Sequence, residues 1–141
     1  MNRSAWAEWR GNLKEGKGKI STDSGVLTDT QYSFSTRFEE GKGTNPEELV
    51  AAAHAGCFAM ALSLILQEKN LVADSIQAKA TVTLEKVDNS FAVTKSHLVV
   101  NAKIPGATAE AFEQAAQTAK ANCPISKLLK AEISMEAKLS S

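Results

Sequence analysis

The chain has 141 residues, 43% of them hydrophobic, which is enough for one domain with a buried core and too few for two well-packed ones. Sixteen basic and sixteen acidic residues leave no net charge, which argues against electrostatic capture of nucleic acid or of an anionic membrane. The N-terminus lacks an apolar stretch followed by a small-residue cleavage site, so we expect no secretory signal and a cytoplasmic protein.

Aromatic, β-branched and alternating residues fill the N-terminal third. In TQYSFSTRF, one face of an extended chain would carry Tyr32, Phe34, Thr36 and Phe38. Two glycine-rich clusters, GNLKEGKG and EEGKGTNP, are typical of turns or loops. We therefore predict antiparallel strands over about residues 3–40.

The segment that starts at TNPEE predicts a helix over about residues 46–69. Asn45 supplies an N-cap, Pro46 suits the first helical position, and Glu48 lies three residues after the cap. Residues 49–66 carry no charge, which also meets the lower length limit for a membrane span. Because the run is rich in alanine and is flanked by sheet-like segments, we interpret it as a buried central helix.

A hairpin, further helices and a final strand are predicted after this run. SIQAKATVTLEKV and FAVTKSHLVVNAKI alternate apolar and polar residues around the turn DNS, which predicts a hairpin over about residues 75–104. The pattern then indicates helices over about residues 108–130 and an alternating strand over about residues 132–140. Strands that cluster, rather than alternate singly with helices, predict an α+β fold with sheets wrapped over central helices, in a single domain over residues 1–141.

The two cysteines are the candidate chemical groups. Cys57 lies in the middle of the apolar run, where inert core packing is the ordinary interpretation of a free cysteine. Cys123 precedes Pro124 at a predicted helix start, where backbone N–H groups lower the pKa of a thiol; the alternative is a small apolar residue before a proline. The residues by themselves therefore make Cys123 the more acidic thiol, unless a cation reaches Cys57.

Arg37 is the candidate cation, because it precedes the helix and its guanidinium keeps its charge where a lysine would lose it. The alternative is a solvated strand residue. Glu47 and Glu48 both complement the helix dipole; we assign Glu48 to that structural role, whereas Glu47 could instead orient Arg37. Glu47 and Cys57 are separated by roughly 15 Å of helix, so an Arg37–Glu47 pair would reach Cys57 only from another subunit or after a bend.

The two histidines are weaker candidates for a catalytic role. His54 lies three residues before Cys57 on the same helical side, which suggests a Cys-His nucleophile pair. We disfavour that pair, because such neighbours seldom reach proton-transfer geometry and no third group is evident to orient the ring. His97 lies on the polar side of a strand and is expected to be solvated. No cluster has metal-ligand spacing, so we expect no bound metal and no bound cofactor.

Two cysteine-centred motifs, STRFEEGKGTNPEELVAAAHAGCFAMALS and ANCPISKLLKAEI, resemble the OsmC/Ohr organic hydroperoxide reductase family, and the likeness extends to GKISTDSGVL. An arginine just before GTNPEE fits the OsmC branch better than the Ohr branch. The resemblance implies an OsmC/Ohr-like fold, in which antiparallel sheets wrap around long central helices in an intertwined homodimer. It leaves open whether Arg37 and Glu47 act on Cys57 of the same or of the partner subunit.

By this resemblance, Cys57 is the peroxidatic nucleophile, Cys123 the resolving thiol, Arg37 the group that holds the thiolate, and Glu47 the carboxylate that positions Arg37. The implied activity is reduction of organic hydroperoxides through a Cys57 sulfenic acid and a Cys57–Cys123 disulfide, which an external dithiol, of a lipoyl or another type, reduces. The resemblance reverses the expected order of acidity and makes Cys57 the more reactive thiol, because a guanidinium held in a dry pocket would favour the Cys57 anion.

Three other functions use the same residues. A non-catalytic peroxide sensor or small-molecule binding protein would use the thiol pair as a switch, and a single stoichiometric oxidation would identify it. A structural protein with two inert cysteines would show slow thiol alkylation. A Cys-His hydrolase would keep ester turnover after removal of Cys123.

Overall fold

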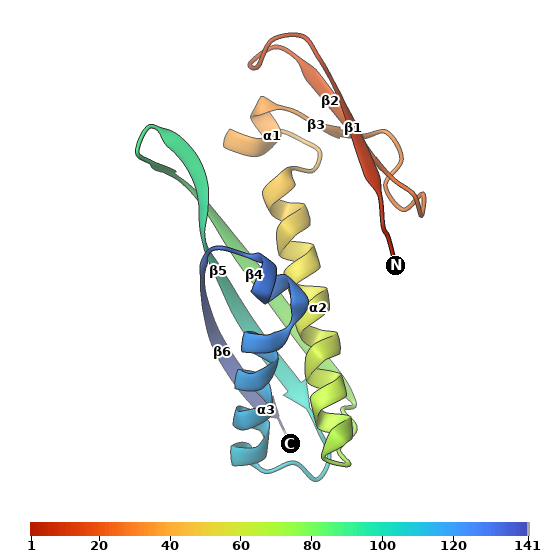
Figure 1. Ribbon diagram of the computed structural model, residues 1–141, viewed down its shortest axis with the longest axis vertical. Coiled ribbons are helices and arrows are strands. Elements are labelled where there is room, and N and C mark those ends of the chain that lie inside the picture. Colours follow the sequence, from red (N-terminus) through yellow and green to blue (C-terminus); the bar gives the residue numbers. More distant parts are fainter. Residues whose placement is uncertain (141) are drawn as a thin grey trace. The chain divides into compact units, whose positions relative to one another are not determined.

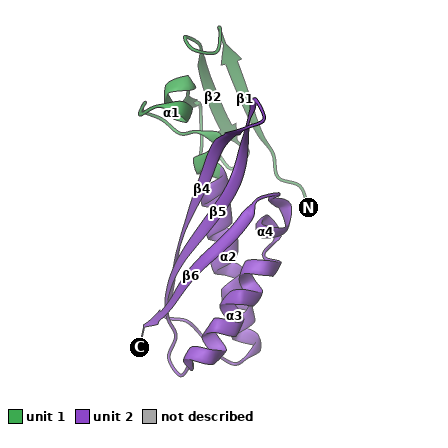
Figure 2. Cartoon of the chain, turned by 90° about the vertical axis from the view of Figure 1, so that its left-hand side faces the viewer, with its two compact units in different colours: residues 1–49 green, residues 50–141 purple. Residues whose placement is uncertain are grey.

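The computed structural model describes residues 1–140, which form two compact units, residues 1–49 and the remainder from residue 50 (Figure 2). The element order is three strands, two helices, a two-stranded hairpin, two helices and a strand (Figure 1). This is the mixed α+β content that the sequence predicts. The prediction that residues 1–141 form one domain stays a prediction.

The N-terminal unit contains a small antiparallel sheet in the order β1-β2-β3, built from β1 (Ala5–Arg10), β2 (Lys17–Thr22) and β3 (Thr30–Tyr32). The Trp9 and Tyr32 rings lie 5.5 Å apart, on either side of Gly18 in the strand register. A Cβ atom at Gly18 would clash with the Tyr32 ring, so this position requires glycine for the two rings to approach.

Residues 34–38 form helix α1 (Phe34–Phe38), which corrects the prediction of a strand through this segment. Positions 34 and 38 share a face in a helix as well as in a strand, and the two phenylalanine rings lie 4.9 Å apart. A capping box decides for the helix: Ser33 accepts the Thr36 N–H, and Thr36 Oγ1 accepts the Ser33 N–H at 2.7 Å. Arg37 therefore lies on a helix and not on a strand.

Helix α2 (Pro46–Glu68) confirms the helix predicted from Pro46. Its buried side chains recur every fourth residue: His54, Phe58, Leu62 and Leu66. The opposite side is not covered in the single chain, where Met60 is 77% and Leu64 58% exposed. The expectation of a helix buried all round is thus met on one face only. By length and mean hydropathy, 2.1, α2 would suffice to cross a membrane, yet one face of it packs into a protein core.

The second unit holds a sheet in the order β4-β5-β6, formed by β4 (Ser75–Val87), β5 (Ser90–Lys103) and β6 (Glu132–Ser140). β4 and β5 are antiparallel, whereas β5 and β6 are parallel. The predicted hairpin turns at Asp88 and Asn89, which both have positive φ angles, 48° and 67°, as a two-residue turn requires.

Helix α3 (Ala109–Asn122) and the short helix α4 (Pro124–Leu128) complete this unit. The core lies between the sheet on one side and α2 and α3 on the other (Figure 1). Its buried hydrophobic members are Phe58, Leu62, Leu66, Leu98, Val100, Ala102, Ile104, Phe112, Ala115, Ala116 and Ala119. Burial of these side chains fixes the α2 face that carries His54 against β5.

Candidate active site

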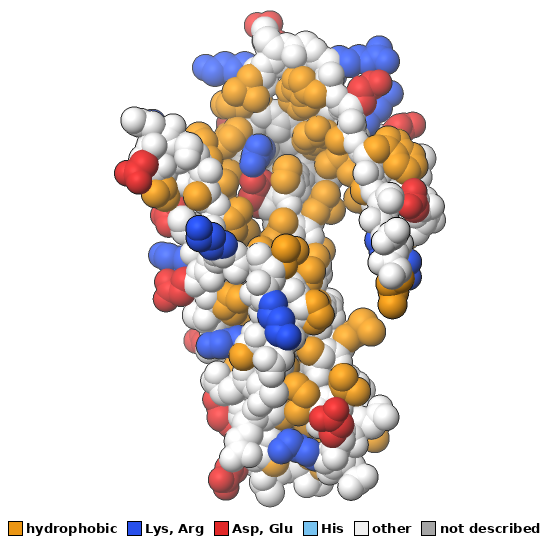
Figure 3. Space-filling model, in the orientation of Figure 1, with side chains coloured by type: hydrophobic (Ala, Val, Ile, Leu, Met, Phe, Trp, Pro, Cys, Tyr) orange, Lys and Arg blue, Asp and Glu red, His pale blue; other side chains and the backbone are white. Residues whose placement is uncertain are grey.

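Cys57 lies in the middle of α2 and is partly exposed. It lines a groove of about 680 Å³ whose walls are mostly apolar and include Met60, Leu64 and Pro124. Hydrophobic side chains stay at the surface of this unit along α2 (Figure 3). The groove can therefore bring an apolar molecule to the Cys57 sulfur.

Cys123 is buried, with 1% of its surface exposed, at the junction of α3 and α4. It is the N-cap residue of α4, with Pro124 in the first turn, as the sequence predicts. Its Sγ accepts the Ser126 N–H at 3.3 Å and lies 3.4 Å from Ser126 Oγ. The sulfur is thus held in one orientation by polar contacts within the first turn of α4.

The structure brings the two thiols together, although they are far apart in the sequence. The Cys57 and Cys123 side chains are close enough to affect the pKa of each other. Burial raises the pKa of Cys57, and the neighbouring Cys123 raises it further. Burial also acts to raise the pKa of Cys123, but hydrogen bonds from Ser126, Cys57 and the Ile125 N–H together lower it. In the single chain, Cys123 is therefore the more acidic thiol, in agreement with the prediction from the residues alone.

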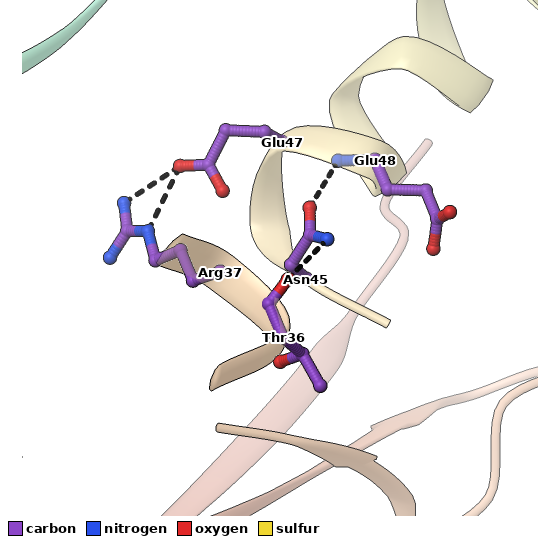
Figure 4. Close-up of polar contacts among 5 residues, drawn as sticks. All are labelled: Thr36, Arg37, Asn45, Glu47 and Glu48. Carbon is purple, nitrogen blue, oxygen red and sulfur yellow. Dashed lines mark hydrogen bonds and ion pairs between the residues drawn. The ribbon is translucent and has the colours of Figure 1, made fainter. Parts of the chain in front are cut away.

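The structure also brings Arg37 and Glu47 together, in the N-terminal unit (Figure 4). Arg37 Nε and Nη2 both donate to Glu47 Oε1, at 3.0 and 2.8 Å. The Glu47 side chain is only 12% exposed, and its Oε2 atom is buried with no hydrogen-bond partner among the described residues. An unpartnered buried carboxylate oxygen is costly, so this oxygen has capacity for a further donor.

An aromatic pocket of about 210 Å³ lies beside Arg37 in the same unit. Trp9, Tyr32, Phe34 and Phe38 contribute to its wall. The guanidinium carbon lies 5.5 Å from the centre of the Phe38 ring, a distance at which a cation and an aromatic ring attract each other. Arg37 is therefore a fixed positive charge at an apolar surface.

Glu48 has the structural role that the sequence predicts. Its N–H donates to Asn45 Oδ1 at 2.7 Å, which caps α2, and its carboxylate accepts from Thr44 Oγ1 at 2.8 Å. Asn45 also donates from Nδ2 to the Thr36 carbonyl at 2.9 Å (Figure 4). One asparagine thus ties α1, which carries Arg37, to the first turn of α2, which carries Glu47.

Sequence reasoning missed two serines that orient His54. His54 is fully buried, and its Nδ1 and Nε2 atoms lie 2.6 Å from Ser96 Oγ and 2.8 Å from Ser126 Oγ. A signal for Ser96 was present, because it alternates with Leu98 and other residues of the buried face of β5. Both ring nitrogens of His54 are occupied by serines, so His54 does not form a Cys-His pair with Cys57, as expected from the sequence.

His97, expected to be solvated, is partly exposed and has partners. Its Nδ1 lies 2.6 Å from Ser134 Oγ, and its Nε2 lies 2.9 Å from Glu136 Oε2. Ser134 and Glu136 are exposed on β6, and His97 on β5 is partly exposed. The structure therefore leaves His97 outside the group of residues around the two thiols.

Comparison with known proteins identifies the family. Residues 39–138 match the family model described as OsmC-like protein. The chain is 50% identical over 141 residues to Peroxiredoxin OsmC of Escherichia coli (strain K12), covering 100% of this chain and 99% of that protein. It is 32% identical over 123 residues to the organic hydroperoxide resistance protein OhrB of Bacillus subtilis (strain 168), covering 86% of this chain and 88% of that one.

The fold agrees with this assignment. The crystal structure of the Bacillus subtilis protein OhrB matches with a TM-score of 0.72 and 30% identity, over 97% of this chain and 98% of that chain. The family model, the relatives and the solved structure thus all match the part of the chain that contains both cysteines. The chain belongs to the OsmC family.

Proposed function

We propose that this protein is a thiol-dependent peroxidase that reduces organic hydroperoxides to alcohols. The names of the relatives support the class: one is a peroxiredoxin and the other an organic hydroperoxide resistance protein. The observation that carries the proposal is the thiol pair, in which Cys57 lines an apolar groove and Cys123 is its buried neighbour. The groove would hold the alkyl or aryl part of the substrate, with the peroxide group at Cys57.

In the first step, the Cys57 thiolate attacks the distal oxygen of the hydroperoxide. An S–O bond forms as the O–O bond breaks, Cys57 becomes a sulfenic acid, and the alkoxide leaves and takes up a proton. Cys123 then attacks the sulfenic sulfur to form a Cys57–Cys123 disulfide, and hydroxide leaves as water. An external dithiol, such as a lipoyl-type dithiol in a reducing cytoplasm, restores both thiols by exchange.

The first step needs a cation, because burial raises the pKa of Cys57 in the single chain. Arg37, oriented by Glu47, is the proposed source, and it would also stabilise the developing alkoxide. Since α2 is continuous and Glu47 and Cys57 are separated by roughly 15 Å of it, we propose that the Arg37–Glu47 pair serves Cys57 of the partner subunit in a homodimer. The exposed apolar side of α2 supports such an intertwined assembly.

Turnover with two peroxides tests the function. With a dithiol present, the protein should consume cumene hydroperoxide faster than hydrogen peroxide and release one alcohol for each hydroperoxide, because the groove favours an apolar substrate. Cys57→Ser should abolish consumption, whereas Cys123→Ser should complete one turnover and then stall or over-oxidise. Thiol counting and alcohol quantification measure both steps.

Two results would contradict this proposal. A Cys57→Ser protein that consumes the organic hydroperoxide at the parent rate would exclude Cys57 as the nucleophile. A single stoichiometric oxidation without turnover in excess dithiol would instead identify a peroxide sensor.

A further inference from the structure

A buried chain of hydrogen bonds ends at the resolving thiol. It runs from Ser96 on β5 through His54 on α2 to Ser126 and Cys123 at the start of α4. Ser96 Oγ lies 2.6 Å from His54 Nδ1, His54 Nε2 lies 2.8 Å from Ser126 Oγ, and Ser126 Oγ lies 3.4 Å from Cys123 Sγ. All four residues are buried, with at most 7% of their surface exposed, so water does not replace these contacts.

The chemistry of a neutral imidazole limits the direction of these bonds. One ring nitrogen donates and the other accepts, and burial lowers the pKa of His54 and so favours this neutral form. If Nε2 carries the proton, it donates to Ser126 Oγ, and the Ser126 hydroxyl proton is free to point at the Cys123 sulfur. If Nδ1 carries the proton, Nε2 accepts from Ser126, whose oxygen can then only accept from a Cys123 thiol.

We propose that His54 is a positioning residue for Cys123: in the Nε2–H tautomer, whose Nδ1 accepts from the Ser96 hydroxyl, it directs the Ser126 hydroxyl to the Cys123 thiolate that attacks the Cys57 sulfenic acid. The inference rests on the proposed function and deepens it. In this step the S–S bond forms as the Cys57 S–O bond breaks. Hydroxide leaves and is protonated to water, Cys123 sulfur is oxidised and Cys57 sulfur is reduced.

The surroundings of Cys123 make the hydrogen bond between the Ser126 hydroxyl and the Cys123 sulfur significant. Among the described residues, the groups that shift its pKa are Ser126, the Ile125 N–H and Cys57, together with burial. Burial alone would raise the pKa of Cys123, and the Ser126 bonds oppose it. A hydroxyl bond to an anion is stronger than one to a neutral group, so its loss should slow the thiolate step in particular.

Separate rates for the two steps test the inference. Reduced protein is mixed with one equivalent of cumene hydroperoxide, and hydroperoxide loss and disulfide formation are followed between about pH 6 and about pH 9. Ser126→Ala should slow disulfide formation by about tenfold at neutral pH and move its pH midpoint upward, because a bond to the anion is lost. Hydroperoxide loss in the first turnover should change by less than about twofold.

The chain offers a matched pair at position 54. His54→Gln keeps an amide donor near the Nε2 position and should retain most of the rate of disulfide formation, whereas His54→Asn keeps only a group near Nδ1 and should resemble Ser126→Ala. A merely structural role predicts equal effects of the two amides, and that result would overturn the inference. So would an unchanged pH midpoint in Ser126→Ala.

A measurement on the parent chain avoids any folding defect in the variants. Nitrogen-15 NMR of the His54 ring should show the Nε2–H tautomer once Cys123 has lost its proton, and the Cys123→Ala protein should lack this pH-dependent response. A ring tautomer that does not change when Cys123 loses its proton would contradict the inference. If the parent consumes no hydroperoxide at all, the proposed function fails, whatever the tautomer.

Discussion

At position 54, the buried histidine makes the stability of the protein depend on pH. Burial lowers its pKa in the folded state below the unfolded value of about 6.5. Above that value, both states hold a neutral ring and His54 adds no pH dependence. Below it, the unfolded state binds a proton that the folded state refuses, so the free energy of unfolding must fall as pH drops.

Urea unfolding of the reduced protein at about pH 7 and about pH 5.5 measures this effect. The midpoint should be lower at the acid pH, and His54→Gln should reduce the difference because the titrating ring is gone. His97→Gln is the control, since it removes an exposed imidazole and keeps the buried one. If His54→Gln loses as much stability at the acid pH as the parent does, His54 is not the cause of the pH dependence.

Among the elements, α1 and the first turn of α2 depend on Asn45. Its Oδ1 caps α2 through the Glu48 N–H, and its Nδ2 holds the Thr36 carbonyl near the end of α1. Asn45→Ala removes both bonds and should lower the free energy of unfolding by about 1–2 kcal/mol. It should also loosen Arg37 relative to Glu47, because the helix that carries Arg37 loses its tie.

Asn45→Asp is the matched variant for this prediction. It keeps the capping oxygen and loses only the donor to Thr36, so its loss of stability should be smaller than that of Asn45→Ala. Denaturant unfolding compares the two. Equal losses would mean that the cap contributes nothing measurable at this helix start.

For the whole molecule, the proposed exchange of residues between subunits has a direct consequence. If Arg37 of one copy serves Cys57 of the other, a heterodimer of Arg37→Gln and Cys57→Ser chains contains one intact site. Each variant alone should be inactive or nearly so, and the co-expressed, doubly tagged heterodimer should regain up to about half of the parent turnover, because one of two sites is complete.

The control replaces the Arg37→Gln chain by the double variant Arg37→Gln, Cys57→Ser, which leaves no complete site in the heterodimer. Activity regained only with the single variants would support the shared site. A heterodimer that co-purifies and stays inactive would show instead that Arg37 acts within its own chain. A parent protein that sediments as a monomer would exclude the shared site altogether.

Local patterns in the sequence predicted the elements that depend on local rules. The Asn45 cap and Pro46 placed the start of α2, alternation placed the β4–β5 hairpin, and Pro124 placed Cys123 at a helix start. The same rules failed at α1, where phenylalanines four apart fit a helix and a strand equally and the Ser33–Thr36 capping box made the choice.

The sequence by itself therefore determined the α+β class, the family motifs and the two candidate thiols. Only the tertiary structure decided what surrounds them. His54 meets Ser96 and Ser126 across 42 and 72 positions of sequence, contacts that no local period encodes. They exist because the apolar faces of α2, α3 and the sheet must be buried together, and that packing carries the polar residues between them into one place.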